Sequence, residues 1–359
     1  VCRHDHFTFD STADIPISAD IIGQSRGIRA IEFGIDIQSE GFNIFVLGQM
    51  GTGRATAIER FLHNRTQDQP EPVDWVYVHN FATPHQPRAI RLPAGEGTIF
   101  CERVKTLHAA LRSELPEAFN GEAYTQAMEM VSGKYEQQHM AMMQEVQQLA
   151  EASGFTIVTT TSGFNVAPLK DGRPITQEEW QALPFETRQQ QEIERQTVTR
   201  ALEETLARVQ LLNREATAEV DEIDAEIIKM VTQPHFQLLR EAYADEDEIL
   251  LYLGEVQSDV AKHISDFAPN DDEPNPNADL ERYGVNVLID NGRLEGAPVI
   301  IEQNPNYHRL IGRLEYEMRE GVVSTHFMNI KSGSLHQANG GYLILNARDV
   351  LKDEFAWEA

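Results

Sequence analysis

A glycine-rich stretch, residues 43–58, has the residue types and the spacing of a site that binds phosphate. The apolar residues 44–47 form a run short enough for a central strand, and we expect this strand to be buried. The glycines that follow allow backbone angles that other residues resist, and a helix then begins. This is the layout of a phosphate loop, in which backbone N–H groups at a helix N-terminus hold phosphates. The residues that we expect to form the loop are Gly48, Gly51, Thr52, Gly53, Arg54 and Ala55.

Two residues of this loop depart from the usual pattern G-x-x-x-x-G-K-[ST]. Arg54 replaces the lysine that reaches the β- and γ-phosphates, and its forked, planar guanidinium contacts phosphate with a different geometry. Ala55 removes the hydroxyl that would coordinate magnesium. The sequence therefore predicts no cofactor with certainty and leaves weak binding of ATP or ADP open.

Few other residues have types and spacings that could do chemistry. Cys2, His4 and His6 are metal-ligating types, but no second cluster accompanies them, so we interpret them as a terminal tail and predict no metal site. Neither G-x-S-x-G nor H-E-x-x-H occurs in the chain. The sequence therefore predicts no catalytic residue within these 359 residues.

The composition argues against several classes of function. The chain has 30 Lys and Arg against 57 Asp and Glu, and a net charge of −27 disfavours nucleic acid or an anionic membrane as partner. No apolar run approaches the length that spans a bilayer. Cys2 and Cys101 are too few for a disulfide framework, which favours a reducing cytoplasm. We therefore expect a cytoplasmic protein without nucleic acid or membrane as partner.

Short helices and strands at both ends of the chain must position the glycine-rich loop. The spacing of isoleucines predicts a helix over residues 20–36, and the helix that follows the loop is expected over 53–63. A further helix is predicted over 98–115. Short apolar or alternating runs predict strands at residues 74–81, 88–92, 283–290, 298–302 and 342–345.

The middle of the chain is rich in Gln, Glu and Met and predicts two long helices, residues 121–153 and 184–231. The second has apolar residues in steps of four and three, so we expect an antiparallel coiled-coil hairpin. Short β-like runs at 155–158 and 164–169 predict a β-hairpin at its tip, and two more helices are expected over 233–267. The predicted seam pairs Leu202, Leu206, Val209, Asn213, Ala216, Val220, Ile223, Ile227 and Met230 with Tyr124, Met128, Val131, Tyr135, Met142, Val146 and Leu149.

Residues 333–346 carry a second pattern, G-x-L-x-x-A-x-G-G-x-L-x-L, which resembles the approach to the Walker B strand in one branch of the AAA+ ATPases. In that branch an Asp-Glu pair at the strand end holds magnesium and polarises the attacking water. Asn346 and Ala347 stand at these positions here. The amide brings no charge and the alanine can do no general-base work, so this Walker B-like position has lost its acids.

With residues 21–35, 41–54 and 304–317, this pattern resembles the N-terminal, AAA+-like region of bacterial Lon-type proteases, above all the LonB-like and LonC group. The resemblance covers about residues 14–359. It implies an α/β fold, in which a P-loop, AAA+-like parallel sheet is incomplete in this chain and carries a long α-helical coiled-coil insertion tipped by a β-hairpin. The implied strand order, 5-1-4-3-2, would need residues beyond Ala359. The expected domains are residues 1–115 and 282–359 for the AAA+-like part, 116–268 for the insertion and 269–281 for a linker.

The resemblance also implies partners and a function. In this family the AAA+ module forms hexameric rings and feeds unfolded polypeptide to a Ser-Lys peptidase domain, which would lie outside this chain. Tyr307, which follows turn-forming residues, is the candidate for an aromatic side chain on a loop in the central channel. Because the acidic and P-loop groups are missing, we expect a substrate-gating and assembly region with little or no ATP hydrolysis. Two alternatives stay open: a working ATP-binding motor of an ATP-dependent Lon protease, and a non-enzymatic coiled-coil interaction protein.

Overall fold

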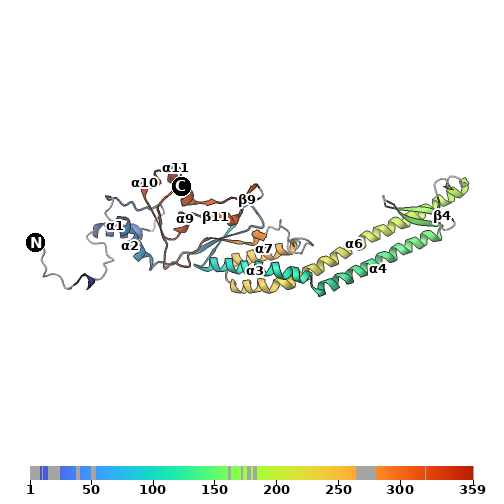
Figure 1. The fold of residues 1–359 in the computed structure, drawn as a ribbon, viewed down its shortest axis with the longest axis horizontal. Helices are drawn as coiled ribbons and strands as arrows, with labels where there is room; N and C mark the ends of the chain where they lie inside the picture. The colour runs from blue at the N-terminus through green and yellow to red at the C-terminus, as the bar shows by residue number, and fades with distance from the viewer. Residues whose placement is uncertain are drawn as a thin grey trace. The chain divides into compact units, whose positions relative to one another are not determined.

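The chain is a mixed α/β protein that divides into two compact units (Figure 1). The computed structural model describes residues 9, 11–14, 25–37, 41–49, 54–160, 163–170, 173–175, 179–180, 184–263, 280–319 and 321–358. Unit 1 comprises Val1–Glu102 and Gly284–Ala359, and unit 2 comprises Arg103–Tyr283. Unit 2 is therefore inserted between the two sequence segments that form unit 1.

Unit 1 contains a three-stranded antiparallel sheet in the order β2-β1-β6. The central strand, β1 (Asp74–Val78), pairs with β2 (Arg88–Leu92) on one side and with β6 (Val285–Ile289) on the other. Alternate residues of β1 are buried, as expected for a strand with one face in the core. The sequence predicts strands in all three places, but none of them pairs in parallel as the implied P-loop sheet would require.

A buried carboxylate fixes one end of this sheet. Asp74 accepts a hydrogen bond from the N–H of Gly97 (2.9 Å), in the first turn of α3 (Glu96–Phe119), and another from the N–H of Asn291 (2.7 Å). Asn291 donates its side-chain amide to the carbonyl of Val73 at 2.8 Å. These bonds join β1, α3 and the segment after β6, which are far apart in the sequence.

One parallel strand pair is present among the described residues, between β7 (Val299–Glu302) and β12 (Tyr342–Leu345). Leu310 is buried in a small cluster with Val350 and Ala356, and Leu343 of β12 packs against them. The predicted strand at 342–345 forms, and most of its residues are half-buried. The short helices of this part are α8 (Tyr307–Ile311), α9 (Ser334–Gln337), α10 (Ala347–Val350) and α11 (Glu354–Glu358).

Two further antiparallel pairs lie between β7 and β12 in the sequence. β8 (Gly312–Leu314) pairs with β11 (Ile330–Ser332), and β9 (Glu317–Arg319) pairs with β10 (Val322–Ser324). The β9–β10 hairpin leaves Met318 largely exposed. Short 3-10 turns complete the described elements: η2 (Thr12–Asp14), η4 (Leu280–Tyr283) and η5 (Phe327–Asn329).

The buried strand predicted at residues 44–47 does not form. Residues 42–49 contain neither helix nor strand, and most of their apolar side chains are exposed. The side chain of Ile44 lies against Gly34 of α1 (Ser25–Asp36) instead. A strand needs a neighbour to satisfy its backbone N–H and C=O groups, and no strand that the structure describes pairs with this segment. The strand order 5-1-4-3-2 that the resemblance implies therefore has no counterpart among the described residues.

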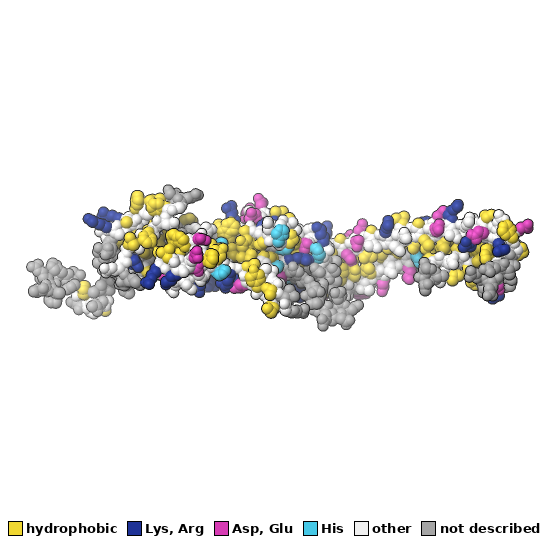
Figure 2. Space-filling view, turned by 90° about the horizontal axis from the view of Figure 1, so that it is seen from above, with side chains coloured by type: hydrophobic (Ala, Val, Ile, Leu, Met, Phe, Trp, Pro, Cys, Tyr) yellow, Lys and Arg dark blue, Asp and Glu magenta, His cyan; other side chains and the backbone are white. Residues whose placement is uncertain are grey.

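Unit 2 is built around two long helices that run side by side in opposite directions, α4 (Glu122–Ala152) and α6 (Phe185–Ala242) (Figure 1). Polar contacts fix their register, because the Tyr124 hydroxyl donates to Asp224 at 2.8 Å and Lys134 pairs with Glu219 at 2.6 Å. Charged and hydrophobic side chains are intermixed on the surface of this pair in Figure 2. The two predicted long helices are therefore present, and they pack on each other.

The apolar seam of this pair agrees with the predicted one at most positions, Leu202 and Val146 among them, and departs from it at three. In α6, Leu212 is buried whereas Asn213 and Met230 are exposed. In α4, Ala150 is fully buried whereas Leu149 is 45% exposed. Steps of three and four describe two neighbouring stripes on one helix equally well, and the partner helix decides which stripe is covered.

The second long helix also runs past its predicted end at residue 231. It continues through Pro234 to Ala242, and α7 (Asp247–Lys262) follows after a short turn. A proline in a helix removes one backbone hydrogen bond. Phe236 and Leu239 are buried beyond it, so packing of the next turns offsets that loss.

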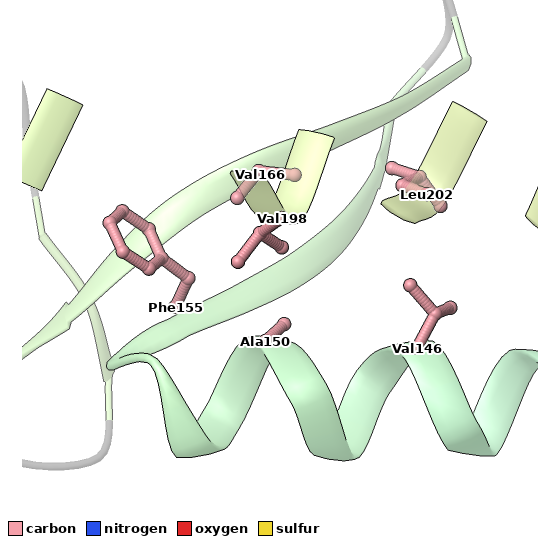
Figure 3. Close-up of a cluster of buried hydrophobic side chains, with 6 residues drawn as sticks. All are labelled: Val146, Ala150, Phe155, Val166, Val198 and Leu202. Carbon is pink, nitrogen blue, oxygen red and sulfur yellow. The ribbon is translucent and has the colours of Figure 1, made fainter. Parts of the chain in front are cut away.

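A hairpin and the adjoining helix turns share one apolar cluster (Figure 3). β3 (Phe155–Thr160) pairs antiparallel with β4 (Gly163–Lys170), and β4 pairs with β5 (Arg173–Pro174). Phe155 lies over Ala150, the last buried residue of α4. The buried members of the cluster are Val146, Ala150, Phe155, Val166, Val198 and Leu202.

Asp259 of α7 holds the point where the chain returns from unit 2. Its carboxylate accepts a hydrogen bond from the Tyr283 hydroxyl at 2.8 Å and forms an ion pair with Arg282 at 3.0 Å. Tyr252 of α7 donates its hydroxyl to the carbonyl of Tyr283 at 3.0 Å. The predicted linker, residues 269–281, lies largely outside the described residues. No helix in the described part of the chain combines the length and apolarity needed to cross a membrane.

Candidate functional site

A hydrogen bond joins two described residues of the glycine-rich loop, Gly48 and Arg54. Arg54 is the first residue of α2 (Arg54–Thr66), and its Nη1 donates to the carbonyl oxygen of Gly48 at 2.6 Å. Ala55, the next residue of this helix, is exposed and offers no hydroxyl. Gly51, Thr52 and Gly53 lie outside the described residues. The guanidinium that would face a phosphate therefore bonds to the backbone of the loop itself.

The Walker B-like residues lie at the carboxyl end of β12. Asn346 is the N-cap of α10, and its side-chain oxygen accepts a hydrogen bond from the N–H of Arg348 at 3.1 Å. Ala347 is the first residue of that helix. An N-cap side chain satisfies a backbone donor that the helix leaves free, so the one oxygen ligand at this position already has a structural role.

These residues do not fit magnesium-dependent chemistry. Asn346, Ala347 and Ala55 supply neither a carboxylate nor a hydroxyl. Among the residues that the structure describes, no hydrogen bond or ion pair joins Gly48 or Arg54 to Asn346. We therefore assign no step of a hydrolytic reaction to them.

Tyr307 lies in the first turn of α8 rather than on the tip of a loop. Asn306 is the N-cap of this helix and accepts the N–H of Arg309 at 3.0 Å. The Tyr307 ring stands edge-on to His308, with 5.7 Å between the ring centroids, and the residue is 42% exposed. Its aromatic surface is therefore accessible, and the short helix limits the directions in which it can point.

Sequence reasoning missed a polar cluster beside Tyr307. Glu302, the last residue of β7, accepts hydrogen bonds from the N–H of Asn304 (2.8 Å), the hydroxyl of Ser334 (2.9 Å) and Arg309 Nη1 (3.3 Å). Burial opposes the charged form of Glu302, but these hydrogen bonds outweigh it and lower the pKa of the carboxyl. The nearby turn-forming residues are the only local signal, because Ser334 is 32 residues further along the chain.

Metal ligands do not gather in the part of the chain that the structure describes. No group of three or more His, Cys, Asp or Glu side chains could hold an ion there. Cys2, His4 and His6 lie outside the described residues. Cys101 is buried and donates its thiol to the carbonyl of Val285 at 3.2 Å.

Two segments of the chain match models of known protein families. Residues 295–359, which include β7, Tyr307 and the Walker B-like position, match the LonB-like AAA domain. Residues 74–107, which include β1, β2 and the first half of α3, match the Lon-like LonC helical domain. No curated protein matches the chain. Together, the two family matches show that this chain contains a Lon-type protease-related region.

Proposed function

We propose that this chain is an ATPase-like substrate-gating and assembly region of a Lon-type serine protease that degrades unfolded polypeptide, with little or no ATP hydrolysis. The observation that carries the proposal is the neutral Asn346-Ala347 pair at the carboxyl end of β12. This pair lies inside the segment that matches the LonB-like AAA domain. The chain thus contains a segment that matches the family but lacks, at this position, the acids that the family's nucleotide chemistry needs.

The contact between Arg54 and Gly48 supports the same proposal. A phosphate would have to compete with a 2.6 Å hydrogen bond between a guanidinium and a carbonyl oxygen. A lysine ammonium at this position would be a compact charge on a flexible stem, free to reach a phosphate. Arginine has instead closed a contact within the loop, so we infer that nucleotide affinity is low and that the loop has a structural role.

The proposed substrate contact is Tyr307. An exposed aromatic ring binds extended chains of varied sequence because it offers a large apolar surface without requiring a particular partner side chain. In the proposed assembly, a hexameric ring in the cytoplasm, Tyr307 would face the channel through which polypeptide passes. The helical pair α4–α6 would guard access to it, and the Ser-Lys peptidase residues would lie outside this sequence.

Steady-state phosphate release tests the loss of ATP hydrolysis. Removal of one electrostatic group from a catalytic site typically lowers turnover by roughly 10²–10³-fold, and this chain lacks several such groups. We expect no turnover above background for the wild-type chain or for Arg54→Lys with Ala55→Thr, because Asn346 and Ala347 still supply no acid. Turnover near one per second by the wild-type chain would refute the proposal in favour of a working motor.

A further inference from the structure

Glu302 joins the parallel strand pair to the helix that carries Tyr307. Its carboxylate is 12% exposed, and Arg309, which donates to it at 3.3 Å, lies two residues after Tyr307 in α8. The same Oε1 atom also accepts the N–H of Asn304 at 2.8 Å, in the turn that leads into α8. One carboxylate thus contacts both the first and the last residue of the segment from 304 to 309.

Ser334 also contacts α8, at its middle residue. It is buried, and its hydroxyl lies 2.9 Å from Glu302 Oε2 and 3.0 Å from the carbonyl oxygen of Arg309. The last carbonyls of a helix have no partner within it, and the single hydroxyl proton of Ser334 is shared between this carbonyl and Glu302. Gly333 lies so close to α8 that a Cβ there would meet the carbonyl of Leu310 at 2.2 Å, which leaves no room for α9 to move toward α8.

The fold gives α8 little stability of its own. The helix has five residues, and helices this short are unstable in water without tertiary contacts. Leu310 anchors its apolar side. Its polar side depends on Glu302 and Ser334, so these two side chains determine how firmly the first turn, and with it Tyr307, is held.

We infer that Glu302 and Ser334 are positioning residues that hold α8 in the orientation that presents the Tyr307 ring to polypeptide. The inference rests on the proposed contact between Tyr307 and unfolded polypeptide. Neither residue touches the polypeptide itself. Their substitution should therefore change polypeptide affinity only while Tyr307 is present, whereas loss of a direct contact would change the affinity in either case.

A double-mutant cycle tests this dependence. The probe is fluorescently labelled, reduced and carboxymethylated α-lactalbumin, a permanently unfolded polypeptide, and its affinity for the whole chain is measured by anisotropy. We expect Tyr307→Ala to weaken binding roughly tenfold, and Glu302→Gln or Ser334→Ala to weaken it roughly threefold to tenfold. In a Tyr307→Ala background, Glu302→Gln should have no further effect because the ring that it positions is already absent.

The matched control is Glu315→Gln, which also removes one carboxylate charge. Glu315 pairs with Arg313 of β8 at 2.7 Å and is 41% exposed, and no contact of its side chain with α8 is seen in the described residues. It should bind polypeptide like the wild-type chain. Circular dichroism checks that each variant keeps its helix content, and Ser334→Ala, which removes a single oxygen atom, is the milder variant if Glu302→Gln does not fold.

Fluorine NMR of a chain that contains 3-fluorotyrosine separates failure of this inference from failure of the proposed function. The Tyr307 resonance, assigned with Tyr307→Phe, should shift or broaden in Glu302→Gln and Ser334→Ala but not in Glu315→Gln. If this resonance and polypeptide affinity both stay as in the wild type, the positioning role is wrong although the proposed function stands. If the resonance responds but neither the wild-type chain nor any variant binds the polypeptide, the proposed function is wrong, and the result supports the role of Glu302 and Ser334 in positioning α8.

Discussion

Replacement of Asp74 by alanine should destabilise unit 1 strongly. The carboxylate is fully buried and accepts two backbone hydrogen bonds, from Gly97 at 2.9 Å and from Asn291 at 2.7 Å. A hydrogen bond to a charged group contributes about 1.5–3 kcal/mol, so the loss of two of them gives about 3–6 kcal/mol. Asp74→Asn keeps one acceptor oxygen and turns an amide N–H₂ toward the other donor, so it should cost about 1–3 kcal/mol.

Urea unfolding of a single-tryptophan chain measures this loss. Trp75 lies in β1 next to Asp74, so a chain with Trp180→Phe and Trp357→Phe reports the unfolding of this sheet. The control is Asp290→Ala. This aspartate in the same unit is exposed and also accepts two hydrogen bonds, from the Thr98 hydroxyl at 2.8 Å and from the N–H of Gly292 at 2.9 Å. Its effect should stay below about 1 kcal/mol. Equal effects of Asp74→Ala and Asp290→Ala would refute the claim that the buried carboxylate holds the three segments together.

Three further predictions concern unit 2. Leu202→Ala should lower the free energy of unfolding by about 2–4 kcal/mol in urea melts, because it opens the cluster in Figure 3, whereas the exposed Asn213→Ala should change it by less than about 0.5 kcal/mol. Burial and the hydrogen bond to Asp224 raise the pKa of Tyr124 from 10.0 to about 12, so its contribution to stability is complete below pH 10 and is lost as pH rises toward 12. Thermal melts across this range should show that loss in the wild-type chain and a smaller one in Tyr124→Phe. Deletion of residues 155–169 should change the affinity of the chain for a labelled unfolded polypeptide, measured by anisotropy, but not its affinity for labelled short peptides. Equal loss of both affinities would contradict a gating role.

Local pattern predicts many helices and strands of this chain. Residues 88–92 form a strand with the predicted bounds, and α4 differs from its predicted span by one residue at each end. These elements carry their own signal, because apolar alternation or helical spacing appears within each segment. The strand at residues 44–47 carries the same apolar signal and still does not form, since a strand also needs a partner that the run itself cannot specify.

The faces of the long helices show a different limit. Leu149 and Asn213 fit the predicted seam, yet both are exposed, and the adjacent Ala150 and Leu212 are buried. One helix rotates by about 100° per residue, so a shift of one position in each heptad moves the stripe only part of the way around the surface. Only the contact with the partner helix selects between such stripes.

Motif spacing predicts some features of the candidate site and misses others. The loss of a lysine at Arg54 and of the acids at Asn346 and Ala347 is readable from motif spacing alone. Glu302 belongs to no motif, and Ser334 occupies an unspecified position of the pattern at residues 333–346. Their relation arises only when α9 packs against the end of β7. The bond from Arg54 to Gly48 also depends on backbone conformation, which spacing does not give.

The most direct test of the account compares polypeptide binding with and without magnesium ATP. The central claim is that this Lon-type protease-related chain contacts unfolded polypeptide through a framework that no longer depends on nucleotide. We predict that reduced, carboxymethylated α-lactalbumin binds the wild-type chain with the same affinity in both conditions, and that native α-lactalbumin does not bind. An affinity that changes about tenfold or more on addition of ATP, or equal binding of the native and unfolded forms, would contradict the account.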